Sequence, residues 1–169
     1  MRSLLKLTAL LLLCGHTVHA DTPKSDALAP SKDGYIRVGY DDLTSYELNI
    51  PDDDASKAVK NASIINAQIP DQLKKLDGKK VVVAGYMLPL AFRKSKVSEL
   101  LLMRTTQGCC FGVAPNINEV IVVKMKEGSE VEPMQDSYFW FYGTFKVGAI
   151  MEQGTLNGIY SLEGEKMEK

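Results

Sequence analysis

Two adjacent cysteines are the side chains of this sequence best suited to reactive chemistry. Cys109 and Cys110 lie in the segment GCCFG, where the flanking glycines allow the backbone unusual dihedral angles. The two histidines, His16 and His19, both lie within the first twenty residues, which have the composition of a secretory signal that is removed on export. The mature chain would then contain no imidazole to activate a serine or a cysteine. The sequence therefore predicts a protein that is not an enzyme.

Three interpretations of the cysteine pair involve no metal. A disulfide between the neighbours would be strained, because consecutive Cα atoms are ~3.8 Å apart whereas unstrained disulfides prefer ~5.5–6 Å. Strain makes such a bond easy to reduce, which suits a switch. Alternatively, Cys109 and Cys110 are small buried side chains in a tight loop, or they bridge to another chain. Thiol–disulfide exchange is the third interpretation, although the sequence places no helix, base or cation beside the pair to activate it.

The fourth interpretation is a metal site. Two thiolates can hold Cu(I), or they can contribute to a Zn(II) site that usually takes four nitrogen or sulfur ligands. Without histidine, the remaining ligands would come from a partner or from Met87, Glu119 and the run Asp52–Asp54, and nothing in their spacing brings them together. Zinc or copper at Cys109 and Cys110 is thus a hypothesis, and otherwise we expect no cofactor.

The start of the chain predicts export. Basic residues precede an apolar run over 7–13, and small residues follow up to Ala20, where a signal peptidase would cut. The run is shorter than the ~20 residues that a membrane-spanning helix needs, so 1–20 is predicted to be a signal peptide. The mature protein would be periplasmic and not transmembrane. An alternative is a lipoprotein anchored at Cys14, although the residue before that cysteine is bulky.

The charge balance of the mature chain narrows the class of partner. Cleavage after Ala20 removes two basic residues and no acid, which leaves 18 Lys and Arg against 21 Asp and Glu. Proteins that bind nucleic acids carry a basic face to neutralise phosphates, so this acidic balance argues against such a partner. We expect a protein partner in the cell envelope instead.

The rest of the sequence predicts a small β domain. Residues 21–34 are polar and contain Pro, Ser and Gly, which indicates a disordered leader. The run Asp52–Asp54 precedes apolar residues at helical spacing and predicts a helix over 55–68. Five strands are predicted, over Lys80–Leu88, Val97–Arg104, Glu119–Met125, Tyr138–Val147 and Gly158–Glu163. The fold class is therefore mainly β with an N-terminal helix, a small five-stranded barrel of the oligonucleotide/oligosaccharide-binding (OB) type over 35–166.

One predicted strand carries an aromatic run, YFWFY. Alternation sends its two phenylalanines to one face, which suits the core, and Tyr138, Trp140 and Tyr142 to the other. The second face is either an ordinary half-exposed surface or a platform on which a sugar or protein segment stacks. Together with Phe111 beside the cysteines, these three residues are the candidate binding surface.

Several motifs resemble domain-of-unknown-function family 3299. They are LDGKKV at 76–81, GYMLPL at 85–90, CCFG at 109–112 and the pair GT at 143–144, and the resemblance covers 35–166. It implies an exported bacterial protein with an OB-like barrel. Members look like accessory proteins, some encoded beside transporter genes linked to metal supply, and the family has no established reaction.

The missing catalytic set and the family resemblance point to the same kind of function. We expect a periplasmic, non-enzymatic accessory or binding protein, associated with a transporter system, that presents the loop of Cys109 and Cys110 to a partner. The alternatives are a zinc- or copper-handling protein that uses both thiols and, with the fewest features in its favour, a thiol–disulfide redox enzyme.

Overall fold

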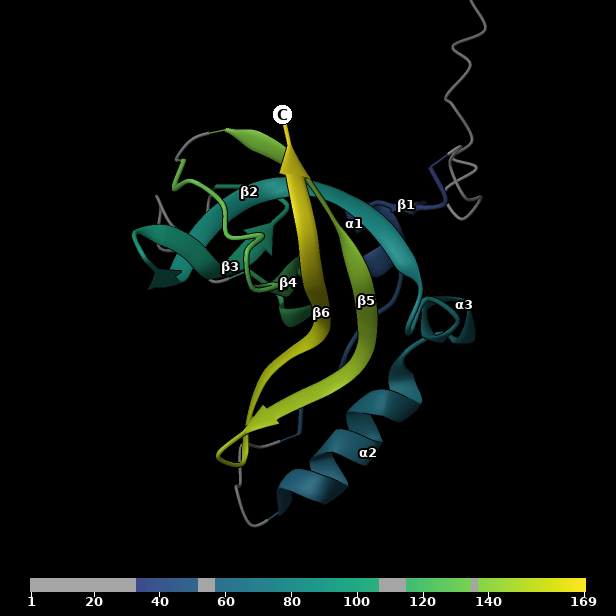
Figure 1. The fold of residues 1–169 in the computed structure, drawn as a ribbon. Coiled ribbons are helices and arrows are strands. Elements are labelled where there is room, and N and C mark those ends of the chain that lie inside the picture. Colours follow the sequence, from purple (N-terminus) through teal and green to yellow (C-terminus); the bar gives the residue numbers. More distant parts are fainter. Residues whose placement is uncertain (1–32, 52–56, 107–114, 135–136) are drawn as a thin grey trace, which may run out of the picture.

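About half of the described chain belongs to one six-stranded sheet (Figure 1). The computed structural model describes residues 33–51, 57–106, 115–134 and 137–169. In chain order the elements are β1 (Ile36–Val38), α1 (Tyr40–Leu43), α2 (Ala58–Gln68), α3 (Asp71–Lys74), β2 (Lys80–Arg93), β3 (Lys96–Met103), the 3₁₀ turn η2 (Ile117–Glu119), β4 (Val120–Met125), β5 (Tyr138–Glu152) and β6 (Thr155–Glu168). The predicted signal peptide and the segment with Cys109, Cys110 and Phe111 lie outside the described residues.

The strand pairings form a ring. β2 pairs with β3, β3 with β4, β4 with β6 and β6 with β5, and β5 pairs back with β2. β2 closes the ring, because its residues before Tyr86 pair with β5 and its later residues pair with β3. The pairing of β4 with β6 is parallel, and the other pairings in the ring are antiparallel. The mainly β fold predicted from the strand patterns is confirmed.

The number of strands was predicted wrongly. The sequence indicated five, and the sixth is β1, which lies parallel to the first half of β2 and pairs Ile36 with Val81 and Val38 with Val83. Three residues are too few to show a period of two, so this strand has no signal of its own in the sequence. The strands β2, β5 and β6 are also longer than predicted, since each continues into a hairpin.

The helix α2, which lies between α1 and α3 in the chain, starts later than the acidic run suggests. α2 begins at Ala58, and its first turn contains no acidic residue. The run Asp52–Asp54, which was expected to begin this helix, lies outside the described residues. α2 buries Asn61 and Ile65 and lies against β5. Pro70 separates it from α3, as its missing N–H and fixed φ angle predict.

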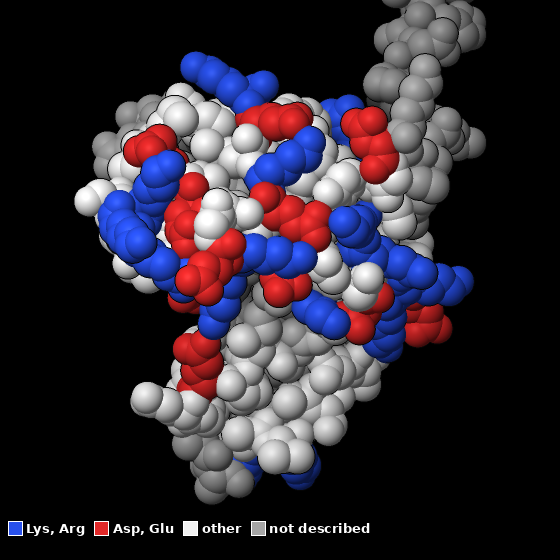
Figure 2. All heavy atoms as spheres, viewed as in Figure 1, with Lys and Arg blue, Asp and Glu red and all other residues white. Residues whose placement is uncertain are grey.

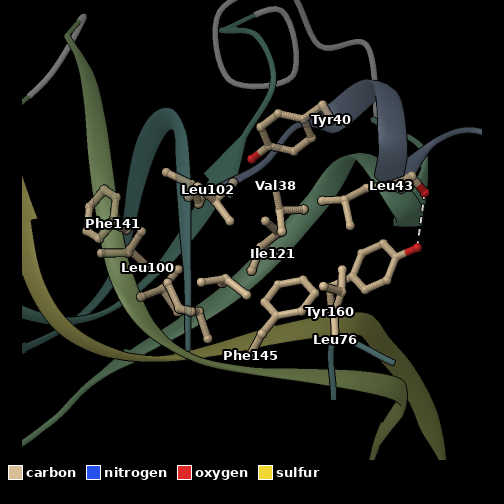
Figure 3. Packing of buried hydrophobic residues seen from close by; sticks show 14 of the residues in the cluster. Val38, Tyr40, Leu43, Leu76, Leu100, Leu102, Ile121, Phe141, Phe145 and Tyr160 are labelled. Atoms are coloured by element: carbon tan, nitrogen blue, oxygen red, sulfur yellow. Dashed lines mark hydrogen bonds between the residues drawn. The ribbon is translucent and has the colours of Figure 1, made fainter. Parts of the chain in front are cut away.

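The core lies inside the ring and under α1 (Figure 3). Alternate residues of the paired strands point inward, among them Val81, Val83, Phe139, Phe141 and Phe145, and all five are fully buried.

One glycine allows strands of the ring to approach closely. A Cβ atom at Gly143 would lie 2.2 Å from the carbonyl oxygen of Glu163 on β6. A glycine is therefore needed where β5 bends against β6.

A carboxylate ties four parts of the sheet together on its outer surface. Glu165 of β6 accepts hydrogen bonds from Tyr35 before β1 at 2.7 Å, from Lys80 at the start of β2 at 3.2 Å, and from Lys126 after β4 at 2.8 Å. Figure 2 shows that acidic and basic side chains are interleaved over this part of the surface, whereas the region of α2 and the β5–β6 hairpin is mostly uncharged.

Candidate functional site

A pocket lies between the segment that follows α1 and the 3₁₀ turn η2. It has a volume of about 490 Å³, within the range usual for ligand sites. We call it the acidic pocket, and its lining residues are Thr44, Tyr46, Glu47, Leu48, Asn49, Ile50, Asn116, Ile117, Asn118 and Glu119.

One wall of the acidic pocket is held by hydrogen bonds to the core and to α2. The hydroxyl of Tyr160 donates to the carbonyl of Leu43 at 3.0 Å (Figure 3), so the hydroxyl of Tyr46, 3.1 Å away, must donate to Tyr160. Burial raises the pKa of Tyr46 and of Tyr160, so both hydroxyls keep their protons at physiological pH. Further along, the side chain of Gln68 bonds the backbone N–H and carbonyl of Asn49 at 2.8 and 2.9 Å.

The opposite wall is the turn η2, which a capping box stabilises. The backbone N–H of Asn116 donates to the Glu119 carboxylate at 3.0 Å. Asn118 is 7% exposed, and its amide nitrogen donates to the carbonyl of Tyr46 at 3.3 Å, which joins the two walls. The amide oxygen of Asn118 accepts no hydrogen bond within the described part of the chain. The pocket is therefore built by fixed backbone and amide groups.

The electrostatic character of this pocket is acidic. Glu47 and Glu119 both line it, and neither forms an ion pair with a described residue. Among the described residues, no lysine, arginine or histidine lines the pocket. Its carboxylates, the amide oxygen of Asn118 and nearby carbonyls all accept hydrogen bonds. Such a lining favours ligands that are rich in hydrogen-bond donors and positively charged.

A smaller apolar pocket adjoins the acidic one. It has a volume of about 130 Å³ and shares Ile50 and Ile117 with the acidic pocket. The other residues that line it are Pro51, Asn61 and Ile65 on one side and Met151 and Leu156 of the β5–β6 hairpin on the other. Ile50, at the junction, leaves 53% of its surface exposed. The two pockets together place a charged recess next to an apolar one.

The predicted aromatic surface lies elsewhere, on the outer face of β5. Tyr138, Trp140 and Tyr142 alternate with buried phenylalanines, and none of the three lines either pocket. Arg37 lies over the Trp140 ring at 4.4 Å, and Lys166 lies over the Tyr142 ring at 4.0 Å. The chain's own cations thus cover part of this face, while Tyr138 remains 47% exposed.

The predicted metal ligands are not brought together where the structure describes them. Met87 is buried in the core, and Glu119 belongs to the capping box of η2. Within the described ranges, no group of three or more His, Cys, Asp or Glu side chains could hold a metal ion. Cys109 and Cys110 lie outside those ranges. In sequence, Cys110 precedes Asn116 of the acidic pocket by six residues.

Sequence reasoning named Glu119 as a possible metal ligand and missed the other residues of the acidic pocket. Tyr46, Glu47 and Asn118 belong to stretches without a clean strand or helix period, and such stretches carry no signal for the residues they will meet. The motif NINE over 116–119, with an asparagine three residues before a glutamate, was the available indication of a capped turn.

A match to a family model identifies the family of this chain. A family model described as a protein of unknown function (DUF3299) matches residues 26–169. The chain belongs to this family. A crystal structure of a DUF3299 family protein from Pseudomonas aeruginosa PAO1, at 2.45 Å resolution, is 24% identical to this chain with a TM-score of 0.53. The alignment covers 77% of this chain and 92% of that one, and at this identity it supports the fold alone.

Two further findings complete the comparison. No curated protein matches the sequence. Within the described ranges, no helix has the length and apolar composition needed to cross a membrane.

Proposed function

We propose that this DUF3299 protein is a periplasmic, non-enzymatic binding protein that recognises a partner protein of the cell envelope. The partner would contact the acidic pocket and the segment of Cys109 and Cys110, which precedes Asn116 of that pocket in the sequence. The observation that carries the proposal is the acidic pocket, whose walls are joined by the bond between Asn118 and Tyr46 and whose carboxylates have no basic partner among the described residues. Export is supported by the composition of residues 1–20.

The pocket has features of a binding site more than of a packing defect. The capping box of η2 and the hydrogen bond between Asn118 and Tyr46 hold both walls of the pocket in place without a ligand. Glu47 is exposed and has no role in holding its own segment, since the described residues make no hydrogen bond to its side chain. Contact with a partner would account for Glu47, which the fold itself does not require.

Cross-linking in intact cells tests the proposal. We expect the wild-type protein and Glu127→Gln, which removes an exposed charge away from the pocket, to recover the same envelope protein after affinity isolation. Glu47→Gln should reduce that recovery, and Cys109→Ser with Cys110→Ser should reduce it as well. Recovery of no specific protein by the wild type, or equal recovery by every variant, would refute the proposal.

The metal-handling alternative rests on Cys109 and Cys110 alone. Titration of the reduced protein with zinc and with copper(I) separates it from the binding role. Binding tighter than micromolar that is lost in the double serine variant would favour metal handling, and weaker binding would remove the alternative.

A further inference from the structure

We propose that the two adjoining pockets bind an extended segment of the partner protein, which places a lysine or arginine in the acidic pocket and an aliphatic side chain in the apolar pocket. This inference rests on the proposed function and specifies the chemistry of the partner. Three features of the described residues carry it: the charge of the acidic pocket, the kind of hydrogen bonds it offers, and the position of the apolar pocket.

The charge of the acidic pocket selects a cation. Glu47 and Glu119 are both in its lining, and no basic side chain of the described residues offsets them. An ammonium or guanidinium group would supply the missing counter-charge. An acidic or phosphorylated segment would instead be repelled, so charge complementarity decides between these classes of partner.

The hydrogen-bonding groups of the acidic pocket make the same selection. Asn118 is more than nine-tenths buried, its nitrogen is engaged with the Tyr46 carbonyl, and its oxygen has no donor among the described residues. Lysine and arginine carry donors and no acceptors, which complements carboxylate and amide oxygens. Because the capping box and the bond between the walls hold η2 in place, these oxygens are oriented before a ligand arrives.

The apolar pocket specifies a second side chain of the same segment. Ile50 and Ile117 line both pockets, so a bound chain passes from one to the other without leaving the surface. In an extended peptide, residues two apart point to the same side and lie ~7 Å from each other. An aliphatic residue two positions from the basic one would lie between Ile65, Met151 and Leu156 and would cover the exposed Ile50.

Peptide titration observed by NMR tests this inference. The probe is the acetylated, amidated pentapeptide Gly-Lys-Gly-Leu-Gly, added to the ¹⁵N-labelled protein at millimolar concentration. We expect it to shift the amide signals of Glu47, Ile50 and Asn118. A peptide with glutamine in place of lysine should bind about five-fold more weakly, which is the upper range for one exposed ion pair. A peptide with glycine in place of leucine should leave the Met151 and Leu156 signals unshifted.

A matched pair of variants locates the cation. Glu47→Gln should bind the lysine peptide about five-fold more weakly than the wild type does. It should bind the glutamine peptide with the same affinity as the wild type, because that peptide already lacks the cation with which Glu47 would pair. Glu127→Gln should bind both peptides like the wild type. Cadaverine, a free diamine, serves as a second probe, and it should bind more weakly than the lysine peptide if the aliphatic side chain contributes.

The outcomes separate this inference from the proposed function. No shift at these signals at millimolar peptide, or equal binding of the lysine and glutamine peptides, overturns the inference. If cross-linking still recovers a partner that depends on Glu47, the proposed function survives that result. If the peptides bind as expected and cross-linking recovers no partner, the peptide-binding inference survives and the proposed envelope role does not.

Discussion

Replacement of Glu165 by glutamine would remove the ionic centre that joins β1, β2, β4 and β6. Hydrogen bonds from Lys126, Tyr35 and Lys80 lower the pKa of Glu165 from 4.5 to about 2. Glutamine keeps the size of the side chain and cannot carry the charge. The substitution therefore tests how much the charged form of this carboxylate stabilises the fold.

The size of the effect follows from the pKa of Glu165. A fall from 4.5 to about 2 sets a ceiling of about 3 kcal/mol on the free energy of unfolding. The lysine side chains are 57% and 40% exposed, so solvent screens their attraction to the carboxylate. We expect Glu165→Gln to lose about 1 kcal/mol of stability at neutral pH.

The lowered pKa of Glu165 determines how the stability difference between wild type and Glu165→Gln changes with pH. A carboxylate with a depressed pKa stabilises the folded state fully above the unfolded value of 4.5, and this contribution is lost as the pH falls through about 2. The stability difference between wild type and Glu165→Gln should therefore be constant from neutral pH to about 5 and then shrink toward zero near pH 2. Urea denaturation across this pH range measures it, with Glu127→Gln as the control. A difference that does not change with pH would refute the reasoning.

Three further predictions concern the close approach of strands, a buried hydroxyl and the thiols. Gly143→Ala should cost about 3 kcal/mol because its Cβ would meet a backbone carbonyl of β6, whereas Gly39→Ala, with an ordinary 3.5 Å contact, should cost less than about 1 kcal/mol in the same thermal unfolding assay. Tyr40→Phe should raise stability by about 1 kcal/mol, because the buried Tyr40 hydroxyl finds no hydrogen-bond partner among the described residues; a loss in urea denaturation would contradict this. Intact-mass analysis should show that alkylation of Cys109 and Cys110 requires prior reduction, and immediate alkylation of both would exclude a disulfide between them.

The sequence predicted the strands better than the pocket for a definite physical reason. Residues of a paired strand alternate between a buried and a half-exposed face, so the run around Tyr138 and Trp140 reveals both its conformation and its orientation. The three residues of β1 are too few to show that alternation. The wall residues Tyr46 and Glu47 follow no period at all, and their positions depend on contacts with Tyr160 and Asn118, which lie far away in the sequence.

By itself, the sequence determined the family through its motifs. It also determined the mainly β fold and the positions of most strands, because local alternation and turn residues encode them. It also singled out Cys109 and Cys110, which lie outside the described residues. Only the tertiary structure decided that the ring of strands brings the segment after α1 against η2. The pocket formed there places two carboxylates, neither in an ion pair with a described residue, beside an apolar pocket. Glu47 and Glu119 are 72 residues apart in the chain. A local sequence pattern cannot predict that they line one pocket, because long-range strand pairing brings their segments together.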